Sequence, residues 1–140
     1  MIDPVNAVSY RKNLKDFSIK LKKIDQEISA KLTPYKGRTF FVYHPAFGYF
    51  ANAYGLKQRA IELNGREASP AQLAQITKEA KAGNISTIFI QEQFNPGSAK
   101  ALARQIGGVA APLDPLAADI CENFIKIARS LESGFNAEKK

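Results

Sequence analysis

The sequence is short of the residues that most often carry covalent and metal chemistry. Its 140 residues include one cysteine, one histidine and no tryptophan. A single cysteine cannot form an internal disulfide, and because Cys121 falls in a segment of helical apolar periodicity we expect a buried, unreactive thiol. The one histidine, His44, cannot complete a zinc site alone, because such sites take three or four protein ligands.

Long hydrophobic runs are also missing. No apolar stretch is long enough to cross a bilayer. The first residues, Met1-Ile2-Asp3-Pro4, lack the basic and apolar regions of a signal peptide. These absences indicate either a cytoplasmic protein or a chain that begins inside a longer one.

Acidic residues are outnumbered: there are 20 basic and 13 acidic side chains, which gives a net charge of +7. Residues 1–38 carry nine basic and four acidic residues. The basic residues are spread around the polar side of a predicted helix without interleaved stacking aromatics, which favours a solvated helix face and argues against nucleic acid as a partner. No glycine-rich phosphate loop and no nucleophile-elbow serine is present, which argues against nucleotide binding and serine hydrolysis.

A long helix is predicted at the start of the chain. Residues 5–33 contain no glycine or proline, Asp3-Pro4 is a typical helix start, and apolar residues from Leu14 to Leu32 recur every three or four positions. About thirty residues make a helix of ~45 Å, whereas a compact chain of this length is only ~35–40 Å across. We therefore expect the helix to project beyond its own domain, either as a spine shared with a second lobe or, because the apolar stripe fades before Leu14, less well as a coiled coil.

The remainder predicts an α/β fold. Strands are expected at 38–43, 57–63, 86–91 and 109–113, and helices at 45–53, 70–82, 97–106 and 115–131. Alternating strands and helices predict a four-stranded parallel sheet with right-handed crossovers and helices on both faces. The domain prediction is a long helix over 1–35, an α/β lobe over 36–133 and a frayed tail over 134–140.

Polar residues follow three of the predicted strands: His44, the pair Glu92 and Gln93, and Asp114. Ligands of open parallel sheets bind beyond the carboxyl ends of the strands, so these residues form the candidate site. Imidazole and carboxylate suit zinc, but His44 and Asp114 supply only two ligands, and a histidine after a strand is more often structural. Asp114 as a phosphate acceptor, and Glu92 with Asp114 as an acid–base pair, are weaker alternatives.

Several motifs occur in an order that resembles a known family. They are His44-Pro45-Ala46-Phe47-Gly48-Tyr49-Phe50, Tyr54-Gly55-Leu56, Ser69-Pro70, Phe89-Ile90-Gln91-Glu92-Gln93-Phe94, Leu113-Asp114-Pro115-Leu116 and, upstream, Asp3-Pro4-Val5-Asn6 with Tyr10 and Asn13. Together they resemble the zinc/manganese solute-binding proteins of ABC transporters (cluster A-I), and the resemblance covers nearly the whole chain.

The resemblance implies two α/β lobes joined by one long helix, with the metal held between the lobes. This chain corresponds to the helix and the C-terminal lobe. The position of His44 then supplies one metal ligand, the position of Asp114 supplies a carboxylate at or beside the metal, and two further histidines come from an N-terminal lobe that this chain lacks. The resemblance makes Glu92 at most a residue that supports a metal ligand without touching the metal. Histidine at position 44 favours zinc over manganese.

The resemblance therefore predicts a non-enzymatic metal-capture module. Its partners are the missing lobe and a membrane permease, and its parent is periplasmic or tethered outside the cell. We expect this fragment to bind zinc weakly and to self-associate through the apolar surface left open. The alternative is a metal-independent, flavodoxin-like interaction or regulatory domain, in which His44 only packs; a small enzyme using Asp114 and Glu92 is a weaker one.

Overall fold

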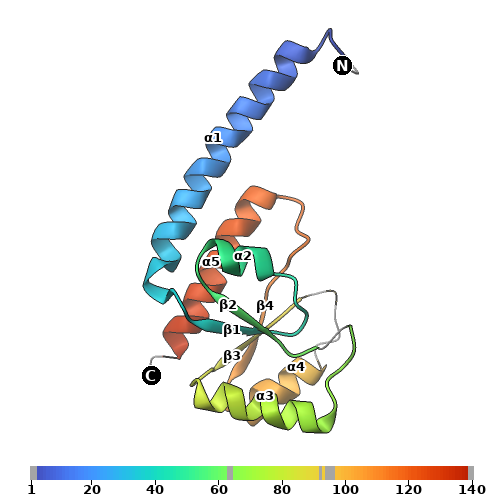
Figure 1. Cartoon of the computed structure of the whole chain (residues 1–140), viewed down its shortest axis with the longest axis vertical. Coiled ribbons are helices and arrows are strands. Elements are labelled where there is room, and N and C mark those ends of the chain that lie inside the picture. The colour runs from blue at the N-terminus through green and yellow to red at the C-terminus, as the bar shows by residue number, and fades with distance from the viewer. Residues whose placement is uncertain (1–2, 63–64, 92, 94–96, 139–140) are drawn as a thin grey trace.

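The sheet predicted from the sequence is present in the computed structural model, which describes residues 3–62, 65–91, 93 and 97–138. Four parallel strands lie in the order β2-β1-β3-β4 (Figure 1). Their bounds are β1 Thr39–Val42, β2 Lys57–Ala60, β3 Thr87–Ile90 and β4 Val109–Pro112. Each strand is shorter than predicted, but the α/β class and the parallel order are confirmed.

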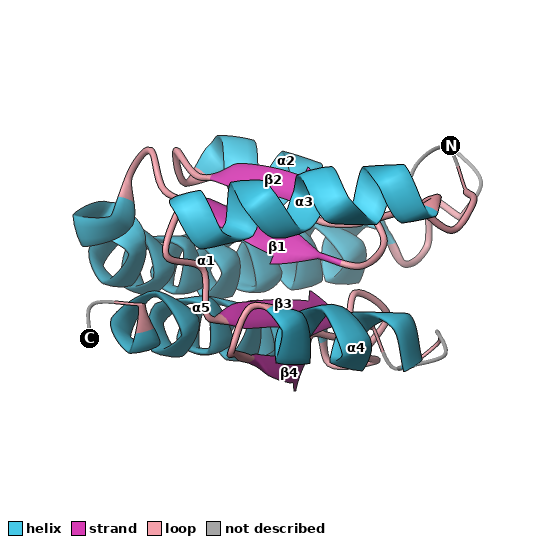
Figure 2. Ribbon diagram, turned by 90° about the horizontal axis from the view of Figure 1, so that it is seen from below, coloured by secondary structure: helices cyan, strands magenta, loops and turns pink. Residues whose placement is uncertain are grey.

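Helices cover both faces of the sheet, as predicted. The helices are α1 Ala7–Leu32, α2 Gly48–Ala53, α3 Pro70–Ala82, α4 Gly97–Gln105 and α5 Ile120–Ala137, with a short 3₁₀ turn, η1, at Thr33–Tyr35. In Figure 2, α3 and α4 lie in front of the strands and α1 and α5 behind them. The alternation within β1 explains both cores: Phe40 and Val42 pack with α1, α2 and α5, whereas Phe41 packs with α3 and α4.

Helix α1 projects well beyond the α/β body (Figure 1), as its length predicts. Its buried residues, Ile24, Ile28 and Leu32, all lie in its second half, where they pack in one core with residues of α5. The predicted start at Asp3-Pro4 is wrong by about one turn. The Asp3 carboxylate accepts hydrogen bonds from Asn6 Nδ2 and from the Tyr10 hydroxyl, both at 2.8 Å, and the helix begins only at Ala7.

Helix α5 corrects two predictions about the end of the chain. It begins at Ile120, where the Asp119 carboxylate caps it, so Leu116 lies outside the helix and is exposed. It continues to Ala137, so the predicted frayed tail is helical up to that residue. Gly134 lies within this helix and allows close packing: a Cβ at this position would lie 2.9 Å from the Phe89 ring.

Candidate metal centre

His44 lies just beyond the end of β1, where main-chain hydrogen bonds continue the sheet. Tyr43 N–H donates to Phe89 O at 2.8 Å, and Glu62 N–H donates to Tyr43 O at 2.9 Å. The last bond brings Glu62, which follows β2, alongside His44. Their side chains meet there, with 2.8 Å between His44 Nδ1 and Glu62 Oε2.

The backbone of His44 is held from the other side by Gln91, which follows β3. Gln91 Oε1 accepts a hydrogen bond from His44 N–H at 3.3 Å, and Gln91 Nε2 donates to His44 O at 2.6 Å. Gln91 is only 1 % exposed. Because a buried amide must satisfy its donor and its acceptor within the protein, this pairing fixes the position of the loop.

The predicted helix starting at Pro45 begins three residues later, at Gly48. Residues 45–47 form a loop in which Ala46 N–H donates to His44 O at 2.9 Å and Phe47 N–H donates to Gln58 Oε1 at 2.7 Å. The loop ends at Phe47, which is buried in the core shared with α1 and α5. His44 is therefore placed by the sheet and its neighbouring side chains, not by a helix N-terminus.

Asp114 follows β4 at the same edge of the sheet. Its Oδ1 atom accepts hydrogen bonds from Gln93 Nε2 at 3.0 Å and from Leu116 N–H at 2.8 Å, and its main-chain oxygen accepts one from Asn123 Nδ2 at 2.8 Å. A cavity of about 320 Å³ opens beside it, against α5. Because Oδ1 already accepts two hydrogen bonds, Oδ2 is the carboxylate oxygen through which Asp114 could bind a metal ion.

Polar side chains thus follow all four strands at the carboxyl edge of the sheet, with β3 between the strands that lead to His44 and Asp114. Glu92 lies outside the described residues. Within the part of the chain that the structure describes, no three His, Cys, Asp or Glu side chains gather to hold a metal ion. His44 and Asp114 can supply an imidazole nitrogen and a carboxylate oxygen, which fit zinc, but they cannot complete its coordination.

Glu62, like Gln91, is a residue of this edge that the sequence did not single out. The predicted second strand ran to Leu63, which placed Glu62 inside a strand, whereas β2 ends at Ala60. The available signal was an acidic residue directly after Ala60-Ile61 in an apolar context. A carboxylate only 7 % exposed needs a polar partner, and His44 is that partner.

Comparison with known proteins identifies the family. A family model described as "ZnuA: Zinc-uptake complex component A periplasmic" matches residues 1–132. The chain belongs to the ZnuA family. This confirms the resemblance to metal-binding solute-binding proteins, while the ligands His44 and Asp114 stay predictions.

Relatives of the ZnuA family match most of this chain. The high-affinity zinc uptake system protein ZnuA of Brucella abortus is 32 % identical over 120 residues, which cover 84 % of this chain and 36 % of that protein. The zinc-binding protein AdcA of Streptococcus pyogenes is 36 % identical over 117 residues, covering 81 % of this chain and 22 % of AdcA.

The fold also matches solved ZnuA-type structures over nearly the whole chain. A crystal structure of ZnuA matches with a TM-score of 0.92 at 38 % identity, covering 95 % of this chain and 50 % of that one. The laminin-binding protein Lmb of Streptococcus agalactiae, described as having adhesin and metal transporting activity, matches with a TM-score of 0.86 at 30 % identity, covering 95 % and 54 %. This chain therefore spans from 22 % to 54 % of the length of these four relatives. No helix among the described residues is long and apolar enough to cross a membrane.

Proposed function

We propose that this chain is the metal-binding lobe of a zinc solute-binding protein, and that His44 Nε2 and Asp114 Oδ2 are its ligands. The metal is cargo, captured for a membrane permease, and the protein is not an enzyme. The observation that carries the proposal is the arrangement at the carboxyl edge of the sheet. There a histidine whose Nδ1 contacts a buried carboxylate lies at the same edge as an aspartate whose Oδ1 is already bonded.

The donor types support zinc over manganese. Zinc is bound well by imidazole nitrogen and accepts carboxylate oxygen, whereas manganese is better suited by oxygen ligands alone. Two ligands leave about half of a tetrahedral shell open. We propose that a second lobe supplies the rest, held opposite this edge by α1, in a parent protein that works in the periplasm or tethered outside the cell.

The first test is a zinc titration of this chain by calorimetry, beside His44→Ala and Asp114→Asn. We expect weak one-to-one binding in the unchanged protein because the shell is incomplete, loss of binding in His44→Ala, and reduced binding in Asp114→Asn. Asn keeps the Oδ1 acceptor that Gln93 and Leu116 use but places an amide NH₂ group where Oδ2 was, and that group donates hydrogen bonds and offers no lone pair to zinc. The loop is therefore expected to keep its structure.

Asp16→Asn is the matched control, because it makes the same substitution on the exposed part of α1, where Asp16 pairs with Lys12. Identical titrations for His44→Ala and the unchanged protein would refute the proposal and favour the metal-independent interaction domain. A submicromolar dissociation constant would contradict the incomplete shell, since two ligands do not account for such affinity.

A further inference from the structure

We propose that Glu62 is a positioning residue that holds His44 with its ring proton on Nδ1, so that Nε2 is the nitrogen presented to the metal. This inference rests on the proposed function, because it concerns how the same site binds zinc. Glu62 itself would not touch the metal. Its effect would pass through the imidazole ring that it orients.

The direction of the hydrogen bond follows from the chemistry of the two groups. A carboxylate has no proton to donate, so in the 2.8 Å contact between Glu62 Oε2 and His44 Nδ1 the ring nitrogen must be the donor. A neutral imidazole carries one N–H, and with that proton on Nδ1 the lone pair is on Nε2. The ring would therefore be set in the form that binds a metal through Nε2.

The fold determines where Glu62 lies. Its N–H continues the parallel ladder by donating to Tyr43 O, one residue before His44. Its side chain is 7 % exposed, so water competes little for the carboxylate. Gln91 fixes the main chain of His44 independently from β3. The ring is thus held at its backbone and at Nδ1 by residues that follow two different strands.

Two consequences for zinc follow from a ring held in this way. Zinc binding would then carry no free-energy cost for fixing the tautomer and rotamer of the ring, because both are set before the metal binds. A carboxylate on the far nitrogen also makes the imidazole a more basic ligand, and removal of such partners typically lowers metal affinity by about 10–100-fold.

The tautomer can be measured directly, because the chain has one histidine and its ring signals need no assignment among others. We would label the histidine with ¹⁵N and record long-range ¹⁵N–¹H correlations without metal at about pH 8.5, where imidazole in model peptides is neutral. The Nδ1–H form is the expected result. A ring found mainly as Nε2–H, or exchanging equally between forms, would overturn the inference without any variant.

Glu62→Gln tests the same point by substitution, because glutamine keeps the shape but can accept from or donate to Nδ1. We expect a mixed tautomer population and zinc affinity lowered about tenfold or more. Glu132→Gln on α5, which removes the same charge from the pair of Glu132 with Lys31 of α1, should change neither quantity. Thermal unfolding of both variants shows whether a loss comes from the fold.

The outcomes separate the two proposals. If His44→Ala leaves zinc binding unchanged, the proposed function fails whatever the tautomer is. If His44→Ala abolishes binding while Glu62→Gln keeps both the tautomer and the affinity of the unchanged protein, His44 is a ligand and Glu62 does not position it. Loss of both in Glu62→Gln with an unchanged melting temperature supports the inference.

Discussion

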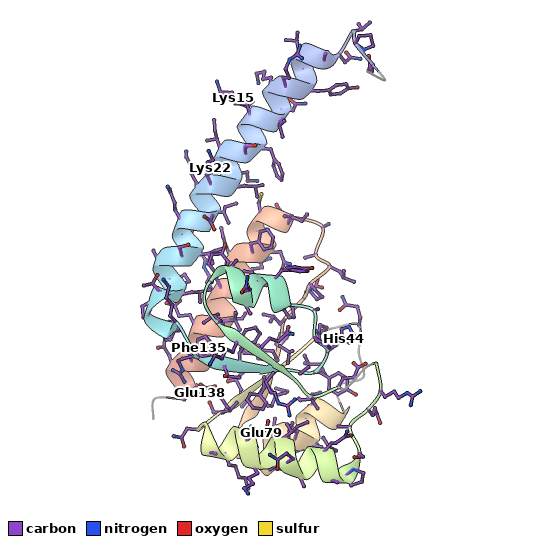
Figure 3. The ribbon with its side chains drawn as sticks, viewed as in Figure 1. Lys15, Lys22, His44, Glu79, Phe135 and Glu138 are labelled. Atoms are coloured by element: carbon purple, nitrogen blue, oxygen red, sulfur yellow. The ribbon has the colours of Figure 1, made fainter. Side chains whose placement is uncertain are left out.

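The Arg38 guanidinium lies over the ring of Phe135, with its central carbon 4.9 Å from the ring centroid. The same side chain donates to Phe135 O at 3.2 Å and pairs with the Glu138 carboxylate. These contacts join the residue before β1 to the last turn of α5. In Figure 3, Phe135 and Glu138 lie on the opposite side of the body from His44. The contact with Arg38 is therefore remote from the candidate metal centre.

Replacing Phe135 with alanine should destabilise the protein strongly. The ring is 1 % exposed and stacks on Tyr35 at 5.1 Å, and removal of such a buried ring costs about 3–5 kcal/mol. The free energy of unfolding in urea measures the effect. Phe124→Ala, on the same helix but with a side chain 38 % exposed, is the control and should cost much less. Equal losses in the two variants would mean that the end of α5 is not packed as described.

Tyr54 should ionise at a higher pH than an ordinary tyrosine. Burial, and then a 3.0 Å hydrogen bond from its hydroxyl to Asp25 Oδ1 and the charge of that carboxylate, raise the pKa of Tyr54 to about 12. In the unfolded chain the pKa of this group is nearer the ordinary tyrosine value of 10.0, so the folded state holds the extra proton between the two values. Stability from this contact is therefore present below pH 10 and is lost as the pH rises toward 12.

Absorbance of tyrosinate during an alkaline titration measures this directly. The chain has five tyrosines, and Tyr54→Phe should remove a step near pH 12 that Asp25→Asn moves to lower pH. Hydrogen bonding to Asp3 also raises the pKa of Tyr10, so Tyr10→Phe is the control that separates its ionisation from that of Tyr54. If the step that Tyr54→Phe removes lies near pH 10 instead, the contact between Tyr54 and Asp25 is contradicted.

We expect this chain to self-associate through the uncovered half of α1. Leu14 and Phe17 continue the apolar stripe of Ile24 and Ile28 but are exposed. Exposed apolar stripes of this kind favour association. Sedimentation velocity over a range of concentrations should show a mass that rises with concentration.

Phe17→Glu should shift that equilibrium toward monomer. Ile19→Glu is a matched control, because Ile19 is 46 % exposed against 48 % for Phe17 but lies about 200° around the helix from it. If both variants behave alike, the effect is one of charge and not of the stripe. A mass independent of concentration in the unchanged protein would rule out the association.

The sequence predicted the architecture well because the fold depends on patterns that repeat along it. Thr87–Ile90 is a continuous apolar run and is buried on both faces, and the helix expected over 70–82 is present, with Ser69 and Gln72 forming a capping box at its start. The ends of individual helices were predicted less well. The last helix was expected to end at residue 131, but α5 continues to Ala137, and Gly134 within it allows close packing against Phe89.

The candidate site was only partly predictable for a related reason. His44 and Asp114 follow strands and were found from that position alone. Glu62 lies 18 residues from His44 and meets it only because β1 and β2 pair in register, Val42 opposite Ala60. Pairing register is a tertiary property, so no local pattern around Glu62 indicates its partner.

The hydrogen bonds from Gln91 reach only the main chain of residue 44. The shape of this loop is therefore set by atoms that every amino acid shares, and the side chain at position 44 can change while its backbone stays in place. A glutamate there would present oxygen to the same point in space, although Glu62 would then repel it. If the proposed site holds, two substitutions, one at position 44 and one that removes the charge at position 62, would change the metal preference at this edge without remodelling the lobe.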